Sequence, residues 1–402
     1  MGIYLKNAST ILSMDPRLDG LGVYHDANIW IENGQIQAIE TSDIEGAQSK
    51  AHNAEGCIVM PGLVDPHTHS IWAGSRSAEF EARLAGADYS EILEQGGGIL
   101  STVRATRSAS NSTLRQLCWQ RLQQLRKSGV TTVEIKSGYG LSPQDEARCL
   151  EIAGALPNSP KVYRTFLGAH TIPQEYRGNR KAYIDNIIHE QLPLVRDFAD
   201  AIDVYCDRGA FTLEESLQIL EAGQAAGLAV RAHAEQCSHT GIAAGAAKLG
   251  AIAIDHLEHA QTSDVEAMAE SGSVAVFLPG AQLYLKDPPP PTAAFREAQI
   301  PIAVGSDLNP GSSPVHSLWT AATLSCLLQG LTVEEALLGI TRNSALALGR
   351  KDIGWIGPKR TADLIVLRPP PGEAPIGAAL IQHLSHPYVR MVIQDGEIVY
   401  QA

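Results

Sequence analysis

The sequence predicts an α/β fold, a (β/α)8 barrel of the TIM type with a small β-sandwich domain formed by both chain termini. Eight short runs rich in β-branched residues recur along the middle of the chain, and each is followed by a stretch with helix signals. The two chain ends differ, because apolar and polar residues alternate there around tight-turn sequences. Nearly continuous apolar strands that alternate with helices form parallel sheets, and eight such units close into a barrel.

The eight predicted strands all run into polar residues at their carboxyl ends, which is where barrel enzymes carry their active sites. They are residues 63–69, 130–135, 161–167, 201–205, 228–233, 251–255, 273–277 and 301–304. Between them, the sequence Thr212-Leu213-Glu214-Glu215 is a capping box that predicts the start of the helix after the fourth strand.

A hairpin is predicted near each end of the chain. Residues 28–36 alternate around Asn33-Gly34, and residues 391–399 alternate around Asp395-Gly396. Both dipeptides favour two-residue hairpin turns, but a lone hairpin is only marginally stable in water. We therefore expect both termini to form one composite β-sandwich domain of residues 1–57 and 355–402, beside a barrel of residues 58–354.

Composition and charge restrict the partners that we expect. The net charge of −13 argues against nucleic acid and against an anionic membrane surface. No apolar run reaches the ~18 residues of a membrane helix, and the first residues lack an export signal. Six cysteines without a CxxC pair favour reduced thiols and a cytoplasmic protein, and a homodimer is compatible with the sequence. We expect a small-molecule substrate; if it is an anion, the site must supply cations, which directs attention to Arg76, Lys136 and the histidines.

The most informative residues are His67 and His69, which follow the first predicted strand. On an extended chain the i, i+2 spacing sends both imidazoles to one face, as half of a metal site. Such a pair alone is more often two core or surface histidines, so the prediction depends on further ligands. Two such ligands, His233 and Asp307, lie at other strand ends, and His170 lies on the same rim. Three imidazoles and a carboxylate would bind a metal and leave room for a water molecule, as in catalytic rather than structural sites.

One further histidine belongs to the same rim. His256 ends the sixth predicted strand, and we expect it to act in catalysis, with packing in the core as the alternative.

The motifs as a set resemble the amidohydrolase superfamily over the whole chain. They are HxH after strand one, histidines after strands five and six, and aspartate after strand eight, together with Gly74-Ser75-Arg76, Lys136-Ser137-Gly138-Tyr139-Gly140, His233-Ala234-Glu235-Gln236 and Gly305-Ser306-Asp307-Leu308-Asn309-Pro310-Gly311. The resemblance implies that one Zn²⁺ or Fe ion per chain is held by His67, His69, His233 and Asp307. It also implies a substrate site lined by Arg76, Tyr139, His170, Gln236, Asn309, Gly311 and Ser312.

Within this superfamily the resemblance implies a hydrolase that opens the ring of 4-imidazolone-5-propanoate to N-formimidoyl-L-glutamate in histidine degradation. Arg76 would then bind the propanoate, because the guanidinium matches a carboxylate with two hydrogen bonds. A cytosine- or guanine-deaminase-like enzyme is the alternative. Members with two metals use a lysine on strand four, and residues 201–207 contain none, so we expect a single metal.

The chain departs from related sequences at one position. Related members place a glutamate three residues after the strand-five histidine, whereas this chain has Gln236, which cannot titrate. We therefore expect Asp307 to carry the proton to the leaving nitrogen, and His256 to stabilise the oxyanion or to assist in deprotonating water.

Overall fold

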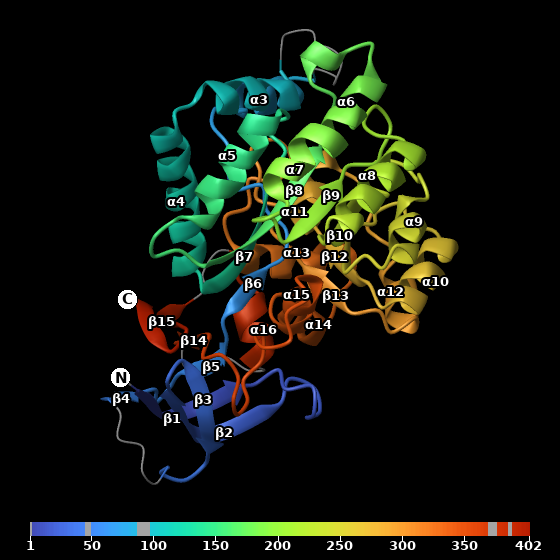
Figure 1. Ribbon diagram of the computed structural model, residues 1–402. Helices are drawn as coiled ribbons and strands as arrows, with labels where there is room; N and C mark the ends of the chain where they lie inside the picture. The colour runs from blue at the N-terminus through green and yellow to red at the C-terminus, as the bar shows by residue number, and fades with distance from the viewer. Residues whose placement is uncertain (1, 45–49, 87–96, 369–375, 385–387) are drawn as a thin grey trace.

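The computed structural model describes residues 2–44, 50–86, 97–368, 376–384 and 388–402. It contains a parallel barrel and, below it in Figure 1, a separate mixed sheet in which strands from both termini lie side by side. The predicted fold class is therefore confirmed. Among the residues described, every helix is too short or too polar to span a lipid bilayer.

The barrel consists of eight parallel strands that pair in sequence order. They are β6 (Leu63–Asp65), β7 (Val130–Lys136), β8 (Lys161–Ala169), β9 (Ala201–Val204), β10 (Ala229–Ala234), β11 (Ala253–His256), β12 (Val274–Phe277) and β13 (Ile302–Val304). Each predicted strand is found, but the first is shorter than expected. The ladder of β6 ends at Asp65, so His67 and His69 follow the strand. Beyond it, a parallel bridge between Thr68 and Leu308 joins the first strand end to the last.

Helices surround the barrel (Figure 1). The α-helices are α1 (Ser77–Leu84), α3 (Ile99–Ser108), α4 (Asn111–Lys127), α5 (Pro143–Gly154), α6 (Arg180–Asn186), α7 (Leu192–Val195), α8 (Leu213–Ala225), α9 (Ile242–Lys248), α10 (Thr262–Ser271), α11 (Pro279–Leu285), α12 (Thr292–Glu297), α13 (Leu318–Gln329), α14 (Val333–Gly339), α15 (Arg342–Ala347) and α16 (Ile376–Ile381). Short η1 (Gln174–Tyr176) and η2 (Ile187–Gln191) flank α6. The predicted capping box is confirmed, because Thr212 and Glu215 bond reciprocally at the start of α8.

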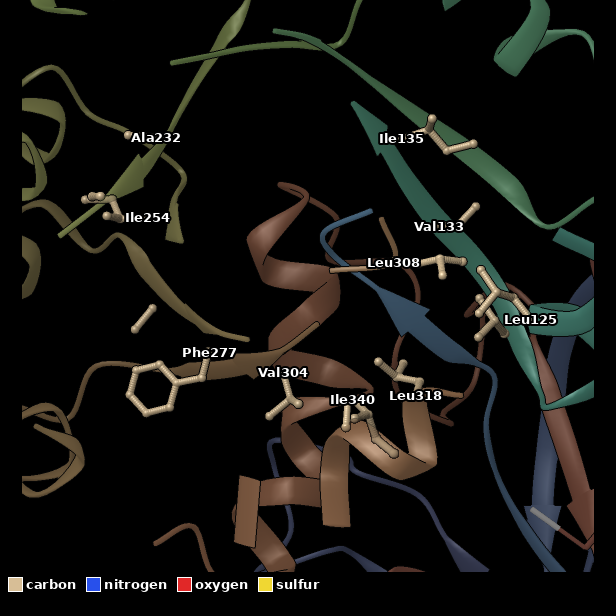
Figure 2. Close-up of a cluster of buried hydrophobic side chains, with 14 of the residues drawn as sticks. Leu125, Val133, Ile135, Ala232, Ile254, Phe277, Val304, Leu308, Leu318 and Ile340 are labelled. Atoms are coloured by element: carbon tan, nitrogen blue, oxygen red, sulfur yellow. The ribbon is translucent and has the colours of Figure 1, made fainter. Parts of the chain in front are cut away.

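The main core lies between the strands and the helices. Figure 2 shows Val133 and Ile135 of β7 and Ile254 of β11 within this apolar cluster, with Leu125 of α4. Successive residues of a strand point to opposite faces, so the positions between these apolar residues face the barrel interior. On β7 these interior positions carry Glu134 and Lys136, which are fully buried charges.

The terminal sheet has the strand order β16-β15-β14-β5-β1-β2-β3, with β4 paired to β1. Its strands are β1 (Ile3–Leu12), β2 (Val23–Glu32), β3 (Gln35–Glu40), β4 (Lys50–Asn53), β5 (Ile58–Pro61), β14 (Leu364–Leu367), β15 (Val389–Gln394) and β16 (Glu397–Gln401). Both predicted hairpins are present, since Glu32 pairs with Gln35 and Gln394 with Glu397. The sheet has its own apolar cluster, which includes Ile29 and Ile393. The domain bounds at residues 57 and 355 stay a prediction. Strand β5, which follows residue 57, pairs within the terminal sheet.

Ion pairs join the terminal sheet to the amino end of the barrel. Nζ of Lys161, the first residue of β8, lies 3.0 Å from Oδ2 of Asp363 and 2.6 Å from Oδ1 of Asp395. The barrel strands therefore start against the terminal sheet and deliver their carboxyl ends to the opposite side, where the candidate site lies.

Candidate metal centre and active site

The side chains of His67, His69, His233 and Asp307 meet at the carboxyl end of the barrel. Nε2 of His69 lies 3.3 Å from Nε2 of His67 and 3.4 Å from Nε2 of His233. Oδ1 of Asp307 lies 3.4 Å and 3.5 Å from the same atoms of His67 and His69. Backbone pairing of the first and last strand ends brings them together, because the Asp307 N–H donates to the His67 carbonyl.

The tautomers of two of these histidines follow from their other ring nitrogens. Nδ1 of His67 lies 2.8 Å from Oδ2 of Asp255, and Nδ1 of His233 lies 3.1 Å from Oδ1 of Asp203. Burial lowers the pKa of both imidazoles, so each is neutral and has one N–H. That N–H donates to the carboxylate, which leaves Nε2 of each ring with a bare lone pair.

These atoms fit a metal ion. Nε2 of His69 lies within 3.3–3.4 Å of the bare lone pairs of His67 and His233, a separation that either a shared proton or a shared cation can satisfy. A tetrahedral zinc ion with bonds of about 2.0–2.1 Å requires ligand atoms about 3.3–3.4 Å apart, which the four measured separations match. The set of nitrogen and oxygen donors suits Zn²⁺ or Fe.

His256 lies beside this cluster. Its ring centroid is 5.7 Å from that of His67 and 5.4 Å from that of His233. Burial alone would lower the pKa of His256, but the Glu258 carboxylate, 3.7 Å from its Nδ1, outweighs burial and raises it. Burial raises the pKa of Asp307 to about 7, although His256 opposes the shift. Asp307, with its raised pKa, and His256, with its raised pKa, are therefore two neighbouring groups that could act as acid or base.

The backbone at these strand ends adopts conformations that L-residues rarely use. His256, Leu257 and Asp307 have φ values of 78°, 74° and 50°. Left-handed residues other than glycine cost about 1–3 kcal/mol each and are concentrated at functional sites. Such backbone conformations therefore occur at the two strand ends that carry His256 and Asp307.

Arg76 lies at the rim, but its guanidinium already has a partner. Nε and Nη2 donate to the two oxygens of Glu79 at 2.9 Å and 2.6 Å. A Cβ atom added to Gly311 would lie 2.3 Å from Nη1, so the guanidinium touches the loop after β13. Arg76 can therefore offer a substrate only the edge formed by Nη1 and Nη2, while Glu79 holds the other edge.

Tyr139 and His170 also lie at the candidate centre. The His170 ring stacks on His69 with centroids 5.0 Å apart, and its Nδ1 lies 3.0 Å from the Gly138 carbonyl oxygen. Tyr139 lies 5.4 Å from His170 between ring centroids. Burial lowers the pKa of His170 to about 3, so this histidine is neutral.

The loop after β13 is ordered by Asn309. Its Oδ1 accepts from the backbone N–H groups of Gly311 and Ser312, both at 2.8 Å. Its Nδ2 donates to the Asp307 carbonyl oxygen. Gln236, the remaining predicted substrate residue, follows β10 and is 7% exposed.

Lys136 does not lie where a substrate could reach it. The sequence directed attention to it as a cation for an anionic substrate, but its side chain has 0% exposure and its Nζ is surrounded by carboxylates. That expectation was wrong, because Lys136, the last residue of β7, points into the barrel, where it is fully buried, and does not belong to the loop that follows.

Sequence reasoning also missed the carboxylates that support the site, which are Glu79, Glu134, Asp203 and Asp255. A signal for Glu134, Asp203 and Asp255 was present, because each is a charged residue within an otherwise apolar predicted strand. Glu134 and Lys136, like Arg231 and His233, are spaced i, i+2 on otherwise apolar strands. Charges on the inner face of a barrel strand must be paired, so such spacings indicate a buried ion network.

Comparisons with known proteins agree with this geometry. The profile of the amidohydrolase family matches residues 85–400. The chain is 42% identical to a protein of Shewanella loihica named imidazolonepropionase, over 97% of each chain. It is 46% identical to one of the same name from Sphingopyxis alaskensis, over 87% of this chain and 88% of that protein.

Solved structures share the fold at lower identity. A triazine hydrolase variant superposes with a TM-score of 0.78 at 17% identity, over 99% of this chain and 94% of the other. An atrazine chlorohydrolase from Arthrobacter aurescens, solved with zinc and atraton, superposes with a TM-score of 0.72 at 16% identity, over 98% of this chain and 94% of the other.

Proposed function

The chain belongs to the amidohydrolase family, and we propose that within this family it is an imidazolonepropionase. It hydrolyses the ring of 4-imidazolone-5-propanoate to N-formimidoyl-L-glutamate, a step of histidine degradation. The relatives of this name support the assignment, since they align over nearly the whole chain at more than 40% identity. The reduced state of the six cysteines suits a cytoplasmic enzyme.

One Zn²⁺ or Fe ion per chain would be held by His67, His69, His233 and Asp307. The support is the convergence of three imidazole nitrogens and a carboxylate oxygen at 3.3–3.5 Å. A bound ion of this kind would lower the pKa of a water molecule and polarise the ring carbonyl of the substrate.

The substrate would lie between the metal centre and the loop after β13. Arg76 binds the propanoate through Nη1 and Nη2, the edge that Glu79 leaves available. Tyr139 and His170 contact the imidazolone ring, and Asn309, Gly311 and Ser312 form the wall beside Arg76. Gln236 contributes a neutral amide that can donate or accept at the ring nitrogens.

The reaction adds one water across one C–N bond. The water oxygen bonds to the ring carbonyl carbon, and His256 stabilises the developing oxyanion or assists in removing the water proton. The bond between that carbon and the ring nitrogen then breaks, and Asp307 carries the proton to this nitrogen. A pKa of about 7 suits Asp307 to gain and lose a proton during turnover.

The observation that carries the proposal is Arg76 against Gly311, in the loop that follows Asp307, in a protein of net charge −13. A carboxylate-bearing substrate requires such a cation, and cytosine or guanine does not. The deciding experiment incubates purified enzyme with 4-imidazolone-5-propanoate and quantifies both formimidoylglutamate and ammonia. We expect formimidoylglutamate mole for mole, no ammonia above the blank, and no activity on cytosine or guanine. Stoichiometric ammonia without formimidoylglutamate would contradict the assignment and favour a deaminase.

A further inference from the structure

A single lysine lies under the candidate metal centre, among three carboxylates. Nζ of Lys136 lies 2.7 Å from Oε1 of Glu134, 2.7 Å from Oδ2 of Asp203 and 3.3 Å from Oδ2 of Asp255. All four side chains have 0% exposure. Nζ donates hydrogen bonds to Glu134 and Asp255, and its contact with Asp203 is an ion pair.

Each of these carboxylates also contacts the segment that carries a proposed metal ligand. Asp255 accepts from Nδ1 of His67 at 2.8 Å. Asp203 accepts from both Nδ1 and the backbone N–H of His233 at 3.1 Å.

The third carboxylate, Glu134, is hydrogen-bonded to the backbone between His67 and His69. Oε2 of Glu134 accepts from the backbone N–H of Thr68 at 3.1 Å, and the Thr68 hydroxyl donates to the Glu134 carbonyl oxygen at 2.7 Å. Lys136 is therefore one side chain away from both strand ends that supply the three histidines.

The buried side chains of this cluster carry more negative than positive charge. The three carboxylates face two buried cations, Lys136 and Arg231, whose Nη2 lies 3.1 Å from Asp255. When all five side chains are ionised, one negative charge is left over. Burial alone would lower the pKa of Lys136, but Asp203 and Glu134 outweigh burial and raise it, so the lysine stays charged.

We propose that Lys136 is a positioning residue for the metal ligands. By holding Glu134, Asp203 and Asp255 at one point, it orients His67 and His233 through their Nδ1 atoms and fixes the backbone between His67 and His69. This inference rests on the proposed ligand set. It differs from a purely structural role, because it requires metal affinity and ligand geometry to change when the lysine is lost.

The test compares Lys136→Met with Lys161→Met. Lys161 is a matched control. It also lies at the end of a barrel strand and contacts two carboxylates, Asp363 and Asp395, but at the opposite end of the barrel. For each metal-free variant, the dissociation constant for Zn²⁺ is measured by competition with a chelator, and the visible spectrum is recorded after loading with Co²⁺.

We expect Lys136→Met to bind Zn²⁺ about 10–100-fold more weakly, as is typical when the groups that orient metal ligands are removed, and to show a changed Co²⁺ spectrum. Lys161→Met should retain the wild-type affinity and spectrum. If wild-type protein binds no ion, the proposed metal site fails. If the wild type binds an ion and Lys136→Met binds it as tightly with the same spectrum, only the role of Lys136 is refuted.

Loss of the buried charge could prevent Lys136→Met from folding. The double variant Lys136→Met/Glu134→Gln removes one charge of each sign, and the amide oxygen introduced by the second substitution can still accept from the Thr68 N–H. Folding is checked by circular dichroism. We expect the folded double variant to bind Zn²⁺ weakly, because Asp203 and Asp255 still lack the lysine, and wild-type affinity would overturn the proposal.

Discussion

Lys136 and Lys161 join carboxylates of different strands at opposite ends of the barrel, but in different surroundings. Lys136 has 0% side-chain exposure and contacts three carboxylates behind the candidate metal centre. Lys161 is 22% exposed and contacts two carboxylates of the terminal sheet. Removing one partner of a fully buried ion network costs about 3–5 kcal/mol, whereas exposed pairs contribute about 0–1 kcal/mol. The buried charges at the carboxyl end therefore fix the positions of neighbouring side chains. At the amino end, the partly exposed Lys161 links the barrel to the terminal sheet.

The largest effect is expected at the carboxyl end, from Asp307→Ala. The carboxylate belongs to the proposed ligand set and carries the proposed proton transfer, so the variant should lose turnover and bound metal. Steady-state kinetics and elemental analysis test this. Asp352→Ala is the control, since Asp352 pairs with Arg350 on the surface, away from the centre, and should leave kcat unchanged. If Asp307→Ala keeps more than about a tenth of the wild-type kcat, equivalent to ~1.4 kcal/mol, another residue carries the proton.

Removal of the metal should distinguish the two ends directly. A ligand at 100 times its dissociation constant stabilises the folded state by about 2.7 kcal/mol, so chelation should lower the melting temperature by several degrees. Hydrogen exchange should increase at the carboxyl ends of β6, β10 and β13, and not in β14 or β15 of the terminal sheet. Elemental analysis should give one ion per chain before chelation, and two ions per chain would contradict the proposed site.

A smaller effect is expected for Arg76→Lys. Lysine keeps the charge, but its ammonium group cannot donate paired hydrogen bonds to both Glu79 and the substrate carboxylate. We therefore expect kcat/KM to fall at least ~10-fold, or ~1.4 kcal/mol. Arg296→Lys is the matched control, because Arg296 makes the same two-bond contact with Glu335 on the surface. An unchanged kcat/KM for Arg76→Lys would move the carboxylate contact to another residue.

The smallest effect is expected for Lys161→Met at the amino end. Loss of its partly exposed ion pairs should lower the free energy of unfolding by about 1 kcal/mol, with no change in kcat or KM. Urea denaturation and kinetics on the same preparation measure both quantities. A reduced kcat would show that the two ends of the barrel are coupled, and the comparison between the lysines would no longer hold.

Much of the fold could be predicted because it depends on local patterns. Eight apolar runs, each followed by a helix, predict a parallel barrel even if the exact strand ends are unknown. The dipeptides Asn33-Gly34 and Asp395-Gly396 each predict a hairpin turn. The strand-end rule then brought His67, His69, His233 and Asp307 to one rim. The length of the first strand was less predictable. The regular ladder of β6 ends at Asp65, next to Pro66, which has no N–H to donate, although the Lys136 N–H still bonds the Thr68 carbonyl oxygen.

The partners of charged side chains could not be predicted in the same way. Arg76 was expected to be available to a substrate, yet Glu79, one helical turn later, binds half of its guanidinium. Lys136 was expected near the substrate, yet it lies inside the barrel. Both outcomes depend on distances between charged groups, which are set only when the strands close into the barrel and α1 packs against it. Ion pairing requires contact within about 4 Å.

The sequence by itself determined the order of strands and helices, the two terminal hairpins and the residues that reach the carboxyl rim. These features follow from periodicity along the chain, which is a local property. Only the tertiary structure decided that Asp203 and Asp255, which are 52 positions apart, meet one lysine from a third strand. Burial inside the closed barrel makes this arrangement specific, because a charge removed from water must find its partners within the protein.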